Sequence, residues 1–173
     1  TGGFKYVNTN YKTLNIASVL SKIYPKFTEL VFSLENSDEP DRLKYISLLL
    51  STIENYYHNH VAIASISYDQ IQASNFSSQT LNNYSEIANM LKSVVGWDIA
   101  IVFMEIQPNV VKISLRTRDS KSYDLSKIAL ATKAGGGHRA AAGATLNQPL
   151  DDAKKTILNI IKKLYPKIDK EIN

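Results

Sequence analysis

The sequence contains no cysteine, and this absence excludes several classes of protein and site. A disulfide-stabilised fold, a thiolate zinc site and a cysteine nucleophile all require that side chain. No stretch reaches the roughly 18 consecutive apolar residues of a membrane-spanning helix, and no signal peptide is visible at the start. We therefore expect a soluble protein of the cytoplasm with no membrane partner.

A strong charge of one sign is also missing. The 173 residues include 20 Lys and Arg against 16 Asp and Glu, so the net charge is only +4. This mild excess suits anionic ligands, but by itself it is weak evidence for a nucleic-acid partner. An apolar share of 44% and a charged share of 21% are ordinary for globular proteins and exclude disordered and coiled-coil classes. The length fits one domain with, at most, a small helical attachment.

The first part of the chain has a helical pattern. Apolar spacing predicts helices over Tyr11–Tyr24 and Lys26–Leu34, and a longer helix that begins near Pro40 and continues to Tyr57. The pattern changes at His58, where short, apolar, β-branched runs begin. We therefore place a domain boundary immediately before His58.

The rest of the chain alternates strand and helix patterns, which predicts an α/β fold with a mixed sheet flanked by helices. A polar loop is expected at Ser74–Ser78, and a turn at Gln107–Asn109 would join two strands as a hairpin. The expected strands are Val61–Tyr68, Ile99–Ile106, Val110–Arg116 and Ala140–Leu146, and the expected helices are Tyr84–Val95, Asp124–Thr132 and Leu150–Leu164.

The most informative local motif is Gly135-Gly136-Gly137-His138. Glycine costs backbone entropy on the order of 1 kcal/mol relative to alanine in a regular element, so a glycine triplet usually occupies positions that side chains cannot. Such a loop brings backbone amides close to a ligand, and His138 with Arg139 adds a titratable donor and a permanent charge. The motif predicts a phosphate-binding loop, although a flexible connection with a surface histidine satisfies the same pattern.

A second cationic feature ends the strand expected at Val110–Arg116. Arg116 and Arg118 are two residues apart, so both side chains lie on one face if the strand persists. Two arginines at a solvated strand end are often incidental. They gain meaning only when they are considered together with the glycine motif.

Three motifs in this order carry a family resemblance: Ser-x-Arg-Thr at 114–117, Asp-Leu-Ser-x-Ile-Ala at 124–129, and Gly-Gly-Gly-His-x-x-Ala-Ala-Gly at 135–143. They resemble the DHHA1 domain, the substrate-binding half of DHH-family phosphoesterases, and most of all its branch of nanoRNases and phosphoadenosine-phosphate phosphatases. The opening Thr-Gly-Gly-Phe is similar to the end of the last metal-site motif of the catalytic DHH domain, whose aspartate would precede Thr1. The resemblance implies that residues 1–57 are the tail of a DHH domain with linker helices, that residues 58–173 are a DHHA1 domain, and that further residues lie upstream.

The resemblance also implies a function. The complete protein would be a metal-dependent hydrolase of phosphoester bonds in short oligonucleotides or nucleotide phosphates, with a two-manganese centre (Mn²⁺) in the DHH domain. The metal-site aspartates and the Asp-His-His signature are absent from this sequence, so catalysis by this chain alone is not expected. The likeness assigns substrate binding to Arg116, Gly135, Gly136, Gly137 and His138, with Ser114 and Arg139 as further candidates. Many relatives have a fourth glycine where this chain has Ala134.

Other functions stay open at this point. The chain also resembles nucleic-acid-binding appendages of alanyl-tRNA synthetases, although the opening segment has no reason to precede such a module. A cyclic-dinucleotide phosphodiesterase or a single-strand exonuclease of the same family is a third alternative. His58-Asn59-His60 lacks the neighbouring carboxylates of a metal site, so we expect a solvated turn there. Nothing in the sequence decides whether the protein forms a homodimer.

Overall fold

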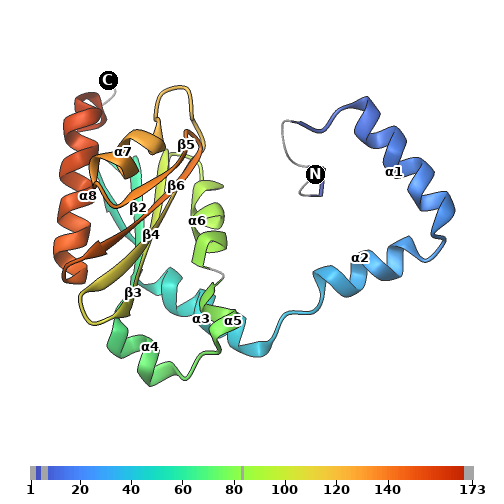
Figure 1. The fold of residues 1–173 in the computed structure, drawn as a ribbon, viewed down its shortest axis with the longest axis horizontal. Helices are drawn as coiled ribbons and strands as arrows, with labels where there is room; N and C mark the ends of the chain where they lie inside the picture. The colour runs from blue at the N-terminus through green and yellow to red at the C-terminus, as the bar shows by residue number, and fades with distance from the viewer. Residues whose placement is uncertain (1–2, 5–7, 83, 170–173) are drawn as a thin grey trace. The chain divides into compact units, whose positions relative to one another are not determined.

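The structure, a computed structural model, describes residues 3–4, 8–82 and 84–169 (Figure 1). The chain divides into two compact units, Thr1–Glu39 and Pro40–Asn173. The metal-site resemblance was found at residues 1–4, of which Thr1 and Gly2 lie outside the described residues. In the part of the chain that is described, no helix is both long and apolar enough to cross a membrane.

The first unit contains two helices, α1 (Tyr11–Ile23) and α2 (Phe27–Glu35). Both were predicted, and their ends agree with the expected ends to within one residue. Asn10 caps α1, because its side-chain oxygen accepts hydrogen bonds from the backbone N–H groups of Lys12 (2.9 Å) and Thr13 (3.3 Å). Neither helix contains a buried residue.

The second unit is built on a six-stranded sheet with the order β1-β2-β3-β4-β6-β5 (Figure 1). Only β2 and β3 pair in parallel, and every other neighbouring pair is antiparallel. The expected α/β class with a mixed sheet is therefore confirmed. The strands are β1 (Glu54–Tyr56), β2 (Val61–Ile66), β3 (Ile99–Gln107), β4 (Val110–Thr117), β5 (Gly135–His138) and β6 (Ala141–Asn147).

Helices cover both faces of the sheet (Figure 1). One core cluster contains Leu125 and Ile128 of α7 and Ile157 of α8, and the other contains Leu49 of α3 and Leu91 of α6. We call these two sides the α8 face and the α6 face. The helices of this unit are α3 (Pro40–Ser51), α4 (Tyr68–Ser74), α5 (Ser78–Asn82), α6 (Tyr84–Lys92), α7 (Leu125–Ala131) and α8 (Leu150–Leu164), followed by the 3₁₀ turn η1 (Pro166–Asp169).

The helix expected to continue to Tyr57 ends earlier, at Ser51. Thr52 turns the chain, because its hydroxyl donates to the carbonyl of Leu49 (2.8 Å) and accepts from the N–H of Ser65 in β2 (3.0 Å). Residues 54–56 then pair with β2 as β1. The compact sheet unit begins at Pro40 and includes α3, so it starts before the expected boundary at His58. That residues 1–57 are the tail of a catalytic domain stays a prediction.

Candidate functional site

Strand β4 carries different side chains on its two faces. Ile113 and Leu115 belong to the core cluster on the α8 face, so the alternate residues Ser114 and Arg116 lie on the α6 face. The register then extends this polar face across the next two strands. Ser114 is opposite Gly143 of β6, which is opposite Gly136 of β5, while Arg116 is opposite Ala141, which is opposite His138. Two short rows of small and polar residues therefore cross this end of the sheet.

All residues of these rows except His138 line a recess of about 260 Å³. Strand residues supply most of its lining, and the N-terminal residues of α6 supply the rest. We call it the Arg116 recess. Its lining residues are Tyr84, Ser85, Ile113, Ser114, Arg116, Gly136, Gly137, Ala141, Ala142 and Gly143.

Arg116 is oriented by its own strand. Its Nη1 donates to the hydroxyl of Ser114 at 3.2 Å and to the carbonyl oxygen of Leu115 at 2.9 Å. Ser114 is itself buried, with 3% of its surface exposed, whereas Arg116 is half-buried. A half-buried guanidinium held in this way is suited to charge-assisted hydrogen bonds with an anionic oxygen. Ser114 therefore positions the guanidinium.

The glycine motif forms the edge strand β5 and not the loop that its sequence predicts. Gly135 to His138 pair with Ala144 to Ala141 of β6, and this backbone pairing holds the segment extended. Because β5 is the last strand of the sheet, one row of its backbone N–H and C=O groups is not paired within the sheet.

The absence of a side chain has a different explanation at different glycines of β5. A Cβ built on Gly135 would lie 2.4 Å from the carbonyl oxygen of Gly143, and one on Gly137 would lie 2.6 Å from Cα of Ala142. Gly137 also has a φ of +138°, a conformation that L side chains rarely adopt. A Cβ on Gly136, by contrast, would meet no atom within 4 Å. Backbone packing explains Gly135 and Gly137, whereas the missing side chain at Gly136 leaves the recess open.

The other two candidates lie near the end of β5. His138 is in the same row as Arg116 and is exposed, but it does not line the recess itself. Arg139 makes its polar contacts elsewhere, because its guanidinium donates to the carbonyl of Ser120 and to the carboxylate of Asp124 at 3.0 Å. The structure therefore does not bring Arg139 to the Arg116 recess.

Asp124 links Arg139 to the start of α7. Its side chain caps the helix by accepting from the N–H and the hydroxyl of Ser126. The Ser126 hydroxyl and, after it, the Arg139 guanidinium hold the pKa of Asp124 below its ordinary value. The Asp-Leu-Ser motif at 124–126 therefore contributes the N-cap of α7, the helix that was expected over Asp124–Thr132, and an anchor for Arg139.

Sequence reasoning missed the contribution of α6 to the recess. It predicted that a helix begins at Tyr84, and this is confirmed, but nothing in the local pattern places Tyr84 and Ser85 beside β4 and β5. Gly143 was noticed only as part of a motif. A Cβ built on Gly143 would lie 2.9 Å from the carbonyl oxygen of Ile113, so close strand packing explains that glycine.

A metal site does not form within the described residues. No group of three His, Asp or Glu side chains in residues 3–4, 8–82 and 84–169 lies close enough together to hold an ion. His58 is exposed in the turn between β1 and β2, in keeping with the solvated turn expected there, and His60 pairs with Asp98.

Comparisons with known proteins agree with this fold. The family model described as the DHHA1 domain matches residues 70–165. A curated relative, the bifunctional oligoribonuclease and PAP phosphatase NrnA of Thermus thermophilus, is 27% identical over 163 residues, covering 94% of this chain and 46% of the relative. An exopolyphosphatase-related protein from Bacteroides fragilis has a similar crystal structure, with a TM-score of 0.80 and 22% identity over 98% of this chain and 48% of that one. The chain thus spans about half the length of the curated relative that it matches.

Proposed function

The chain belongs to the DHHA1 domain family, and from this premise we propose that it is the substrate-binding part of a DHH-family phosphoesterase. The complete protein would hydrolyse phosphoester bonds in short oligonucleotides or nucleotide phosphates. The name of the Thermus thermophilus relative, an oligoribonuclease and PAP phosphatase, supports this substrate class. The proposal places the protein in the cytoplasm.

The observation that carries the proposal is the open position at Gly136. Ser114, Arg116 and Gly136 line one recess, and a Cβ at Gly136 would project into space that no protein atom fills. A phosphate placed there would receive charge-assisted hydrogen bonds from the Arg116 guanidinium. His138, one strand beyond Ala141 in the same row, and the unpaired backbone groups of β5 would supply further donors.

The proposed role of this chain is to orient the phosphate and to neutralise its charge. The described residues do not provide a set of metal ligands. We propose that a two-manganese centre belongs to a part of the complete protein that this chain does not span. Metal ions of that kind supply an activated water for attack on phosphorus. Arg116 and His138 would stabilise the negative charge that develops on the phosphate oxygens.

A binding experiment tests this assignment. The chain is titrated with a 5′-phosphorylated dinucleotide, and the titration is repeated with Arg116→Gln, His138→Ala and the control Lys127→Gln. Lys127 is an exposed residue of α7, so its substitution removes one positive charge without touching the recess. We expect Arg116→Gln to raise the dissociation constant about tenfold, because it removes a charge-assisted hydrogen bond. The change for His138→Ala should be smaller, since this exposed side chain does not line the recess.

Two results would contradict the proposal. Equal dissociation constants for wild type, Arg116→Gln and Lys127→Gln would remove Arg116 from the binding site. Affinity that rises steadily with RNA length, with a steep dependence on salt, would instead favour a nucleic-acid-binding module that recognises the phosphate backbone.

A further inference from the structure

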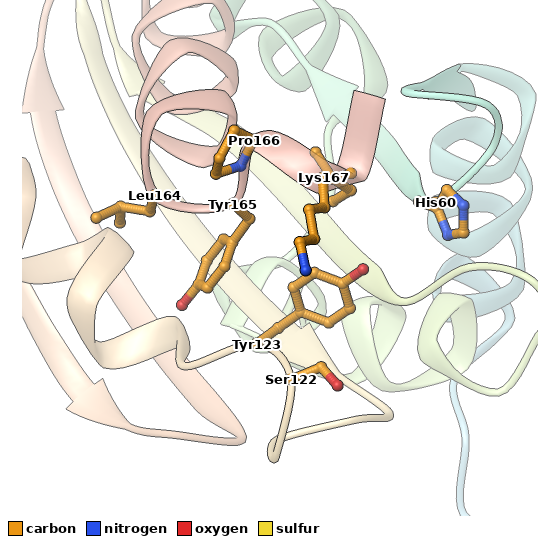
Figure 2. Close-up of a pocket in the computed structure, with 8 residues that line it drawn as sticks. His60, Ser122, Tyr123, Leu164, Tyr165, Pro166 and Lys167 are labelled. Atoms are coloured by element: carbon orange, nitrogen blue, oxygen red, sulfur yellow. The ribbon is translucent and has the colours of Figure 1, made fainter. Parts of the chain in front are cut away.

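A second cleft lies on the other side of the same end of the sheet. It has a volume of about 520 Å³, within the range of small-molecule sites, and it shares no lining residue with the Arg116 recess. We call it the His60 cleft (Figure 2). Its lining residues are His60, Ser122, Tyr123, Leu164, Tyr165, Pro166, Lys167 and Ile168.

The imidazole of His60 is held in one orientation. Its Nδ1 lies 2.6 Å from Oδ2 of Asp98, and about four fifths of each side chain is buried, since 19% and 24% are exposed. A carboxylate can only accept, so Nδ1 carries the hydrogen and Nε2 of the neutral ring is an acceptor. Asp98 is held in turn, because its backbone N–H donates to the carbonyl of His60 (2.9 Å) and its carbonyl accepts from the hydroxyl of Thr117 (2.7 Å). Within the described part of the chain, Nε2 of His60 has no hydrogen-bond partner.

The backbone before His60 is unusual. Tyr57, His58 and Asn59 all have positive φ values, of 52°, 53° and 70°. Non-glycine residues in this region cost on the order of 1 kcal/mol each, and such strain persists only where the surroundings impose it. Here the Tyr57 hydroxyl anchors the turn by donating to the carbonyl of Leu158 in α8 (2.9 Å). The turn therefore fixes the position of His60 in the wall of the cleft.

Two tyrosine rings form another part of the cleft wall. Tyr123 and Tyr165 pack edge to face, with ring centroids 5.3 Å apart. The hydroxyl of Tyr165 accepts from the N–H of Asp124 and donates to its carbonyl, both at 2.8 Å, so this ring is rigidly placed. Both tyrosines are half-buried and line the cleft, so part of their surface is accessible to a planar ligand.

The cleft also presents a cation. Lys167 is exposed, has no ion pair or hydrogen bond with any residue that the structure describes, and extends toward Tyr123 in Figure 2. Among the acids near the cleft, Asp98 pairs with His60 and Asp169 pairs with Lys162 at 2.6 Å. The carboxylate of Asp119, near Tyr123, accepts from the backbone N–H groups of Lys121 and Ser122. The cleft thus brings together an aromatic surface, a fixed hydrogen-bond acceptor and a positive charge.

We propose that the His60 cleft binds a phosphorylated nucleoside, at a site separate from the Arg116 recess. The base would pack on Tyr123 and Tyr165, as bases do on aromatic side chains elsewhere. His60 Nε2 would accept a hydrogen bond from a ribose hydroxyl, and the Lys167 ammonium would contact the phosphate. The ligand is either a free mononucleotide or the terminal nucleotide of an oligonucleotide.

Amide NMR shifts of the ¹⁵N-labelled chain test the proposal. AMP should shift the signals of Ser122, Tyr123 and Lys167, and adenosine or ribose 5-phosphate should bind the cleft more weakly, since each lacks one recognised group. Lys167→Gln should raise the dissociation constant for AMP about tenfold, as expected for the loss of one charge-assisted contact. The matched control is Lys163→Gln, at an exposed position of α8 outside the cleft. It should leave the constant within twofold.

Further arms separate this site from the proposed substrate site and identify the source of the nucleotide. Arg116→Gln should not change the AMP-induced shifts at residues 122–123, 165 and 167–168, whatever it does to dinucleotide binding. Saturation of the cleft by AMP at a lower concentration than by a 5′-phosphorylated trinucleotide identifies a free nucleotide, and the reverse order identifies an oligonucleotide end. The proposal is overturned if millimolar AMP shifts none of these amides, or if Lys167→Gln and Lys163→Gln give equal constants.

Discussion

The two faces of strands β4 and β6 have different roles. On the α8 face, Ile113, Leu115 and Ala144 are buried in the core between the sheet and the helices α7 and α8. On the α6 face, Arg116 and Gly143 line a recess that stays open to solvent. Side chains along a strand point alternately to the two faces of the sheet, so those of neighbouring residues point to the core or to the recess. A substitution here should therefore act on stability or on binding according to which face it touches.

The sharpest stability test compares the neighbours Leu115 and Arg116. Leu115 is fully buried, so Leu115→Ala should lower the free energy of unfolding by about 2–5 kcal/mol through lost burial and a cavity. Arg116→Gln keeps the packing on the α8 face and should change this free energy much less, while it weakens dinucleotide binding. Urea unfolding curves measure both effects. The contrast between the two faces fails if the two variants lose similar amounts of stability.

The next largest loss of stability is expected at the two glycines of β5 that pack closely against β6. Gly137→Ala places a Cβ 2.6 Å from Cα of Ala142 in a backbone conformation that disfavours side chains. We expect a loss of about 1–3 kcal/mol, as for overpacked sites, and Gly135→Ala should behave similarly because of its contact with Gly143. Loss of hydrogen-exchange protection along β5 and β6 would localise the damage. Full stability in both variants would mean that β5 is not packed as described.

A smaller effect, confined to acid, should come from Asp124 on the α8 side. Its pKa is lowered in the folded protein, first by the Ser126 hydroxyl and then by Arg139, so the carboxylate form favours folding. This contribution is complete above the ordinary Asp pKa of about 4 and is lost as the pH falls through the lowered value. The free energy of unfolding, measured between pH 6 and pH 2, should therefore fall less in Asp124→Asn than in wild type.

Two partial variants check the cause of that shift. Ser126→Ala should remove more of the acid dependence than Arg139→Gln, because the hydroxyl has the larger influence on the pKa. Identical acid dependence in wild type and Asp124→Asn would show that this carboxyl does not titrate with a lowered pKa.

Much of the fold was predictable because local pattern and tertiary packing agree. The apolar runs of β2, β3 and β4 and the amphipathic helix α8 were predicted from sequence. The missed elements have two different causes. Strand β1 exists because it pairs with β2, which is a distant contact. The short helix α4 has a local signal at its start, because Ser67 and Gln70 form a capping box, and the contact of the Tyr68 N–H with the carboxylate of Glu105, 37 residues away, adds to it.

In the candidate site, too, the residues marked by a local motif were predictable, and those placed by tertiary contacts were not. Arg116 and Gly136 were found from motifs, and the structure places both in one recess. The extended form of Gly135 to His138 was not predictable, since glycine has little intrinsic preference for strands and pairing with β6 imposes that conformation. The position of Tyr84 beside β4 and β5 also depends on tertiary packing. Nothing in the sequence around His60 indicated Asp98 as its partner, because the two meet only when β2 and β3 pair in parallel.

Gly136 gives the smallest expected change in stability and the most decisive comparison. Its Cβ would meet no atom within 4 Å, so Gly136→Ala should keep the free energy of unfolding within about 0.5 kcal/mol of wild type, a typical range for uncrowded positions. The methyl group would nevertheless enter the recess beside Ser114 and Arg116. Binding of a 5′-phosphorylated dinucleotide should therefore weaken, and Gly136→Leu should weaken it further. If Gly136→Ala binds as wild type does, the ligand does not approach β5 at this position, and the open space at Gly136 has another cause.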